Sequence, residues 1–134
     1  MSDLFNPYAS LYETPKGPGD ARPTALRILE DNDVLGKWRG RVALVTGGTS
    51  GIGYETARAL HATGADVYFT ARDMQKGLEA AERIRKEGSG GGGGGKVQAL
   101  LMDMDSLESV KAAARTFLSS SDKLNILINN AGMN

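Results

Sequence analysis

The sequence predicts an α/β protein built on a parallel sheet with helices on both of its faces. From Arg41 onward, short apolar runs alternate with longer stretches in which apolar residues recur at helical spacing. The apolar runs are nearly continuous, which is typical of strands buried on both faces. Parallel strands need crossover connections, and the sequence places a helical stretch between successive runs.

The first strand and helix surround a glycine-rich turn. Residues 41–48, RVALVTGG, are apolar and partly β-branched before two glycines, which predicts a buried strand and then a tight turn. Residues 50–64 predict a helix that stops at Gly64. The residues expected on its inward face are Ile52, Thr56, Ala59 and Leu60.

The second unit repeats this order. Residues 65–71, ADVYFTA, predict a strand, and residues 72–88 predict a helix that Asp73 caps and Gly88 ends. The residues expected on its inward face are Met74, Leu78, Ala81 and Ile84.

A third strand and helix and a fourth strand complete the pattern. Residues 96–103 predict a strand, residues 106–120 a helix capped by Ser106, and residues 124–130 the last strand. The inward residues of this helix are expected to be Leu107, Val110, Ala114 and Phe117. Right-handed crossovers then favour the amino-terminal half of a Rossmann-type sheet, with strand order 3-2-1-4. Its fourth strand would be an apolar edge.

The chain divides into an irregular arm at 1–37, with a short helix that Pro23 opens, and a partial dinucleotide-binding domain at 38–134. Three of the four prolines precede residue 22. Residues 88–95 hold seven glycines and one serine. We expect a flexible loop expansion there, away from any ligand, because it leads from a helix back into a strand.

Composition excludes several classes of protein. Sixteen basic and sixteen acidic residues cancel, so charge gives no argument for a nucleic-acid partner. The absence of cysteine excludes disulfides, and His61, expected to be exposed on its helix, cannot build a metal site alone. No apolar run is long enough for a transmembrane segment, and residues 1–10 do not form a secretory signal. The compartment stays unknown, with the cytoplasm as the default.

The stretch TGGTSGIG, Thr46–Gly53, carries the strongest functional signal. Glycines at a strand-to-helix turn let a pyrophosphate approach backbone N–H groups, and the helix dipole favours the anion. A phosphate-binding P-loop is excluded because the turn has no lysine. The cofactor-binding residues expected here are Gly47, Thr49, Ser50, Gly51, Ile52 and Gly53.

This glycine pattern resembles that of the short-chain dehydrogenases/reductases, TGxxxGxG. The resemblance covers about residues 38–134, and the arm is similar to the leaders of retinol-dehydrogenase-like members. It implies that Asp103, with Met104 beside it, contacts the adenine ring, and that the NNAG motif places Asn130, Ala131 and Gly132 along the cofactor. A local capping role for Asp103 and a backbone-binding role for the asparagines are the structural alternatives.

The end of the second strand bears on which dinucleotide is bound. NAD-binding folds place an acid there, whereas this sequence has Ala71 followed by Arg72. A guanidinium suits a 2′-phosphate, so NADP is expected over NAD, the alternative being that Arg72 is a solvated surface charge.

Catalytic residues are not expected within this chain. In the family that the sequence resembles, a serine and a Tyr-x-x-x-Lys pair follow the NNAG motif and serve alcohol/carbonyl interconversion. Tyr12 and Lys16 have the spacing, but they lie in the arm. We therefore expect a fragment of an NADP-dependent oxidoreductase, whose small-molecule substrate would bind only to the full-length form. The alternatives are a non-catalytic nucleotide-binding module and a non-functional truncated product.

Overall fold

The sheet has the predicted parallel topology. The structure is a computed structural model that describes residues 6–88 and 95–132. Its strands are β1 (Val42–Val45), β2 (Asp66–Ala71), β3 (Val97–Leu101) and β4 (Ile126–Ile128), in the order β3-β2-β1-β4. All three pairings are parallel, so the carboxyl ends of the four strands lie along one edge of the sheet.

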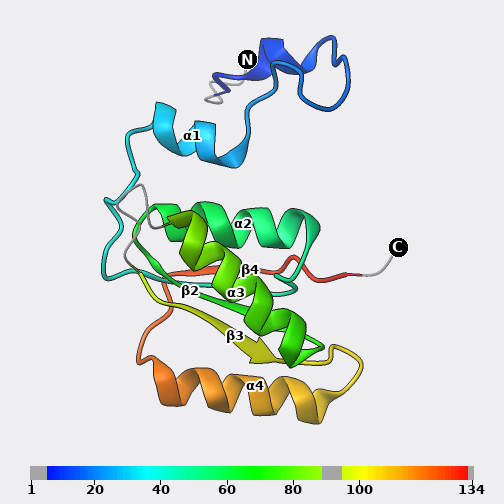
Figure 1. The fold of residues 1–134 in the computed structure, drawn as a ribbon, viewed down its shortest axis with the longest axis vertical. Helices are drawn as coiled ribbons and strands as arrows, with labels where there is room; N and C mark the ends of the chain where they lie inside the picture. The colour runs from blue at the N-terminus through cyan, green and yellow to red at the C-terminus, as the bar shows by residue number, and fades with distance from the viewer. Residues whose placement is uncertain (1–5, 89–94, 133–134) are drawn as a thin grey trace, which may run out of the picture.

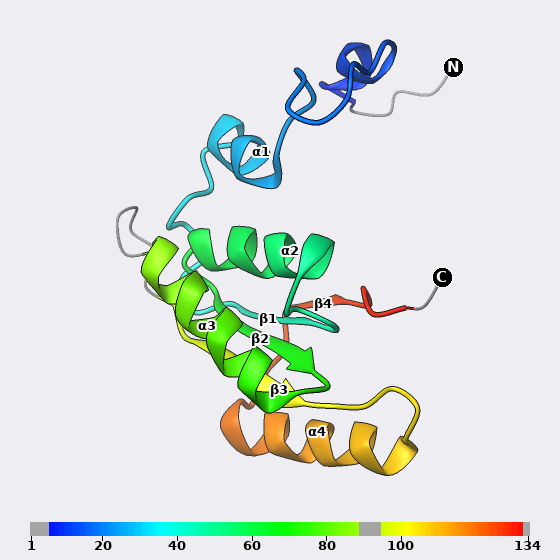
Figure 2. The same cartoon turned by 45° about the vertical axis from the view of Figure 1, so that its right-hand side comes forward.

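Helices cover both faces of this sheet, as the sequence predicts. The helices α2 (Gly51–Ala62) and α3 (Met74–Gly88) lie together on one face, and α4 (Leu107–Ser120) lies on the other (Figures 1 and 2). The larger core fills the first face, where Phe69 and Ile84 are completely buried. On the second face, the rings of Tyr68 and Phe117 meet edge to face with centroids 5.0 Å apart.

The prediction of which helix residues face the sheet is partly wrong. Ile52 is 80% exposed, Leu78 55% and Leu107 77%, and Met74 and Ala114 are exposed too. Small residues face the sheet instead, among them Ala57, Gly77, Ala80 and Ala113.

Close approach of α3 to the sheet explains this choice of face. A Cβ on Gly77 would lie 2.9 Å from the Cβ of Ala99 and 3.1 Å from that of Ala71. Because the helix backbone comes so near the strands, long side chains are displaced to its flanks. The sequence pattern ranks residues by hydrophobicity, whereas the packing here selects them by size.

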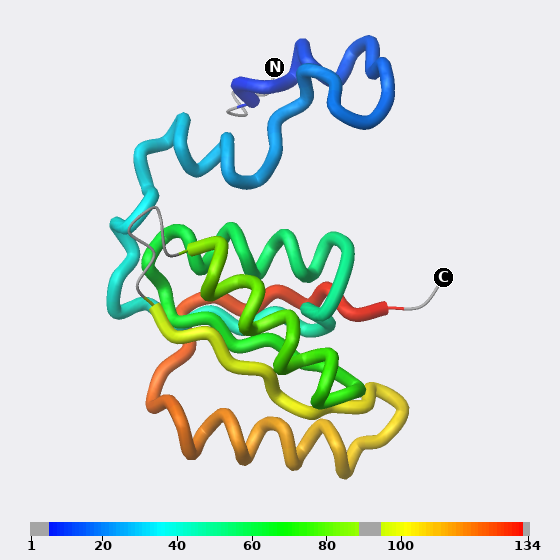
Figure 3. The backbone as a smooth tube through the Cα atoms, viewed as in Figure 1, coloured from blue at the N-terminus to red at the C-terminus, as the bar shows by residue number. Residues whose placement is uncertain are grey.

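The amino-terminal arm has more local order than the sequence predicts. A 3₁₀ turn covers Ala9–Tyr12, and helix α1 spans Ala25–Asp31 on the side of α2 that faces away from the sheet (Figure 3). Helix α1 begins two residues after Pro23, because Thr24 caps it by accepting a hydrogen bond from the backbone N–H of Arg27. The Tyr8 hydroxyl donates to the Asp31 carboxylate at 2.9 Å, which ties the turn to α1.

The expectation that His61 is exposed is wrong. The side chain is 4% exposed, and its Nε2 lies 2.9 Å from the carbonyl oxygen of Gly95. It therefore packs against Gly88 at the end of α3 and Gly95 before β3. The expected flexibility of the connection between α3 and β3 concerns mainly residues 89–94, which lie outside the described residues.

No helix in the described part of the chain has both the length and the apolar character needed to cross a membrane.

Candidate functional site

A cavity of about 430 Å³ lies at the carboxyl edge of the sheet. Every strand contributes the segment that follows it, which is the usual place for a ligand in an open parallel sheet. The predicted site residues that line it are Gly47, Thr49, Ser50, Arg72, Asp103, Met104, Asn130, Ala131 and Gly132.

Three predicted residues lie beside the cavity rather than on its wall. Gly51, Ile52 and Gly53 form the first turn of α2. Four lining residues were not predicted as site residues: Thr70, Ala71, Met102 and Asp105. The available signal was their position at strand ends, since each lies at or just after the end of β2 or β3.

The glycines of the turn after β1 are required by close packing. Gly47 has a φ of +75°, which suits glycine, and a Cβ on Gly53 would overlap the Gly47 carbonyl oxygen. A Cβ on Gly48 would lie 2.6 Å from the Phe69 ring. The backbone of this turn is therefore folded against the start of α2, and only glycines allow that path.

Asn130 fastens the turn from the fourth strand. Its side-chain Nδ2 donates hydrogen bonds to the carbonyl oxygens of Thr46 and Gly47, each at 3.1 Å. In return, the Thr46 hydroxyl oxygen accepts from the backbone N–H groups of Asn130 and Ala131, each at 3.0 Å. The side-chain amide of Asn130 thus does what the structural alternative foresaw, while the residue also lines the cavity.

Thr70 fastens the same turn from the second strand. This buried hydroxyl accepts a hydrogen bond from the Gly47 N–H at 2.9 Å, and the Thr70 carbonyl accepts one from the Gly48 N–H. Sequence reasoning missed it because the partner lies 23 residues away.

Ser50 occupies the N-cap of α2 without capping it. Its side chain makes no capping hydrogen bond, although serine usually does so in this position. Because Ser50 also lines the cavity, its hydroxyl and the first N–H groups of α2 form a favourable environment for an anion.

Arg72 is exposed at the cavity wall, directly after β2. Within residues 6–88 and 95–132, no hydrogen bond or ion pair holds its guanidinium. The neighbouring Asp73 serves as a helix cap, because its carboxylate accepts from the Lys76 N–H at 3.1 Å, as predicted. The end of β2 therefore presents a cation without an acidic partner.

Asp103 has the local capping role considered for it, and it also lines the cavity. One carboxylate oxygen accepts from the Asp105 N–H at 3.0 Å, and the Ser109 hydroxyl accepts from the Asp103 N–H at 2.8 Å. These bonds fix the turn before α4, while the side chain stays exposed at the cavity. The carboxylate can thus accept a further hydrogen bond from a ligand.

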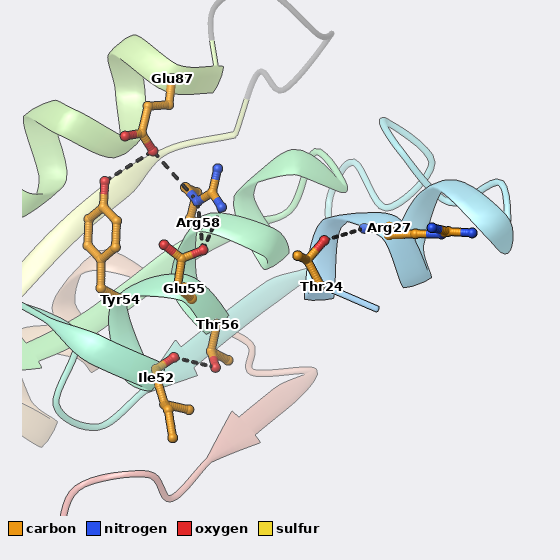
Figure 4. A network of polar contacts seen from close by, with 8 residues as sticks. All are labelled: Thr24, Arg27, Ile52, Tyr54, Glu55, Thr56, Arg58 and Glu87. Atoms are coloured by element: carbon orange, nitrogen blue, oxygen red, sulfur yellow. Dashed lines mark hydrogen bonds and ion pairs between the residues drawn. The ribbon is translucent and has the colours of Figure 1, made fainter. Parts of the chain in front are cut away.

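A polar network joins α2 to α3 behind the glycine turn. The Tyr54 hydroxyl donates to the Glu87 carboxylate at 3.1 Å, and Glu87 lies 3.7 Å from Nε of Arg58, which also pairs with Glu55 (Figure 4). Burial, followed by the bond to Glu87, raises the pKa of Tyr54. The same figure shows the Thr56 hydroxyl bonded within α2 to the carbonyl oxygen of Ile52, at 2.7 Å.

The similarity to known proteins covers the same part of the chain as the sheet and its helices. The family model described as short chain dehydrogenase matches residues 41–134. The short-chain dehydrogenase/reductase prx1 of Penicillium rubens is 49% identical over 94% of this chain, and mouse retinol dehydrogenase 12 is 43% identical over 70%. These matches cover 35% and 28% of those proteins, so the chain spans about a third of the length of the curated relatives it matches.

Solved structures agree with this match. A Pseudomonas aeruginosa RhlG/NADP active-site complex superposes with a TM-score of 0.63 at 36% identity, covering 72% of this chain and 36% of that one. L-sorbose reductase from Gluconobacter frateurii, complexed with NADPH and L-sorbose, has a TM-score of 0.63 at 33% identity, covering 71% of this chain and 34% of that one.

Proposed function

This chain belongs to the short-chain dehydrogenase/reductase family, and we propose that it binds NADP for an enzyme that interconverts an alcohol and a carbonyl. The observation that carries the proposal is the cavity at the carboxyl edge of the sheet. It brings together the glycine turn, the exposed guanidinium of Arg72 and the exposed carboxylate of Asp103.

Each part of the cavity suits a different part of the dinucleotide. The turn from Gly47 to Ser50 and the start of α2 would hold the pyrophosphate. Arg72 would hold the 2′-phosphate through charge-assisted hydrogen bonds, and Asp103 would accept from the adenine amino group. When bound, the nicotinamide supplies the hydride chemistry.

Proton transfer to or from the substrate needs residues other than those of this cavity. Among the described residues that line it there is no tyrosine, and Tyr54 and Tyr68 are buried in the packing of the two sheet faces. We therefore assign this chain the cofactor-binding role, and the acid–base residues to other parts of the protein that contains it.

Replacing Arg72 tests the choice of dinucleotide. In Arg72→Ala, we expect the dissociation constant of NADPH to rise about tenfold or more, because a charge-assisted contact to the 2′-phosphate is lost. The dissociation constant of NADH should change less than about twofold. Both constants can be measured by titrating nicotinamide fluorescence.

Lys76→Ala is the matched control for this experiment. Lys76 is an exposed cation four residues further on, and it does not line the cavity. Its loss should leave both dissociation constants near their wild-type values. Equal weakening of NADPH and NADH in Arg72→Ala would contradict the assignment of Arg72 to the 2′-phosphate.

A further inference from the structure

Arg83, on the second helix after the glycine turn, reaches back to that turn. The residue belongs to α3, and its guanidinium carbon lies 4.6 Å from the centre of the Tyr54 ring on α2. Its Nη2 donates a hydrogen bond to the carbonyl oxygen of Thr49 at 3.4 Å. One side chain thus bridges α3, α2 and the turn between β1 and α2.

The Tyr54 ring is a fixed platform for this guanidinium. It is buried in the larger core, and its hydroxyl is held by Glu87, which in turn lies beside Arg58 (Figure 4). A guanidinium above an aromatic ring is attracted to the face of that ring, so the buried Tyr54 ring limits where the Arg83 guanidinium can lie. The direction in which Arg83 donates is therefore set by packing between α2 and α3.

The carbonyl that Arg83 holds belongs to the wall of the cavity. The peptide between Thr49 and Ser50 is planar, so fixing the Thr49 oxygen also fixes the direction of the Ser50 N–H. Both residues line the cavity, whereas Arg83 does not. They stand between Gly47 and Gly51, which have φ values of +75° and +60°. Glycines give a turn wide conformational freedom, so an external tether matters there.

We propose that Arg83 is a positioning residue for the dinucleotide: it holds the Thr49–Ser50 peptide in the orientation that receives the pyrophosphate. The inference rests on the proposed function and deepens it. Arg83 acts through the Thr49 carbonyl and makes no contact with the ligand. The pyrophosphate is common to both dinucleotides. Loss of the Arg83 guanidinium should therefore weaken the binding of NADPH and of NADH alike.

The test measures dissociation constants of NADPH and NADH for variants of the full-length protein. Arg83→Met keeps the apolar stem and removes the donor. We expect both dissociation constants to rise by the same factor, about fivefold to tenfold. Arg72→Ala in the same assay should weaken NADPH alone, so the two arginines have different signatures.

Arg85→Met is the control for a general loss of positive charge. Arg85 is an exposed arginine on the same helix, and it bonds Glu82 and the Val97 carbonyl, away from the cavity. We expect its dissociation constants to match the wild type. If Arg83→Met binds as tightly as the wild type, or if Arg85→Met is weakened equally, the positioning role is overturned.

The Tyr54 platform supplies a second, independent variant. Tyr54→Leu removes the ring but leaves the Arg83 charge, and it should weaken both dinucleotides as Arg83→Met does. The double variant should be no weaker than either single one, because both break the same unit. Tyr54→Phe keeps the ring, and it should bind NADPH and NADH as tightly as the wild type does. Wild-type affinity in a folded Tyr54→Leu would overturn the proposal.

The two proposals fail in different ways. Absence of NADPH and NADH binding by the wild-type protein would contradict the proposed function itself. Binding by the wild type that Arg83→Met leaves unchanged would contradict only the positioning role.

Discussion

Asn130 shows how one side chain can serve both the fold and the site. Its amide donates to two carbonyl oxygens of the turn after β1, and the residue itself lines the cavity. The turn therefore takes its shape from β4, more than 80 residues later in the chain. Any change in the amide should disturb stability and ligand binding together.

Asn130→Asp should be strongly destabilising for this reason. A carboxylate there would face the carbonyl oxygens of Thr46 and Gly47 without a donor, so two hydrogen bonds become repulsive contacts. We expect a loss of roughly 1–3 kcal/mol in the free energy of unfolding. Urea denaturation followed by circular dichroism measures it.

Asn129→Asp is the matched control, because the neighbouring asparagine is exposed. It should change the free energy of unfolding by less than about 0.5 kcal/mol. If the two substitutions cost the same, the hydrogen bonds of Asn130 to the turn are not what holds it.

Residues of the site differ in how far the sequence could predict them. Arg72 follows directly after β2, and its position predicted that it lies at the carboxyl edge, whereas the role expected of Asp103 came mainly from the family resemblance. For Asn130, the sequence offered a backbone-binding role as an alternative, without naming its partners in the turn. Thr70 depends on a partner 23 residues away, which no local pattern reveals.

The packing at the two ends of the connection from α3 to β3 could not be predicted from local sequence either. The glycine tract predicts a loop, but nothing local indicates that its end glycines pack against buried groups. A Cβ on Gly88 would lie 2.7 Å from the His61 ring, and one on Gly95 would overlap the Ala65 carbonyl oxygen. Glycine is therefore needed at both ends of the tract for close packing.

A double-mutant cycle between Gly88 and His61 tests this packing. Alanine in place of glycine normally favours a helix by up to about 1 kcal/mol. Here Gly88→Ala should instead destabilise the protein, because the buried ring of His61 leaves no space for the methyl group.

In a His61→Ala background, the same substitution should be neutral or stabilising. The expected coupling energy is about 1 kcal/mol or more, obtained from the unfolding free energies of the four proteins. Additive effects would show that the contact between the His61 ring and Gly88 of α3 does not limit the stability of the protein.

Helix faces were the least predictable feature of the elements. The predicted caps at Asp73 and Ser106 are local, and the structure has a hydrogen bond at each. The inward faces depend on how closely a helix approaches the sheet. Where Gly77 nearly touches Ala99, hydrophobicity is a poor guide and size decides.

The sheet as a whole was predictable because several constraints agree. Alternating strands and helices, nearly continuous apolar strands and right-handed crossovers together leave few topologies. The strand order β3-β2-β1-β4 matches that expectation. Among the described residues, β4 pairs only with β1, and Leu127 on it is 53% exposed. The predicted apolar edge is thus present in the structure.

The proposed function depends on this topology, because the sheet gathers the ends of four strands around one cavity. The glycine turn after β1, Arg72 after β2, Asp103 after β3 and Asn130 after β4 are far apart in sequence. Only the parallel sheet brings them together. A bound dinucleotide should therefore change the surroundings of all four segments together.

The decisive measurement is an NMR titration of the isotope-labelled protein with NADPH, following each backbone amide. We expect shifts in four separate segments, residues 46–53, 70–72, 102–105 and 130–132, with one common dissociation constant. The opposite edge of the sheet, around Lys96 and Asp122, should remain unchanged. A folded protein whose amides in these four segments do not move, or whose shifts gather at the opposite edge, would contradict a dinucleotide site in this cavity.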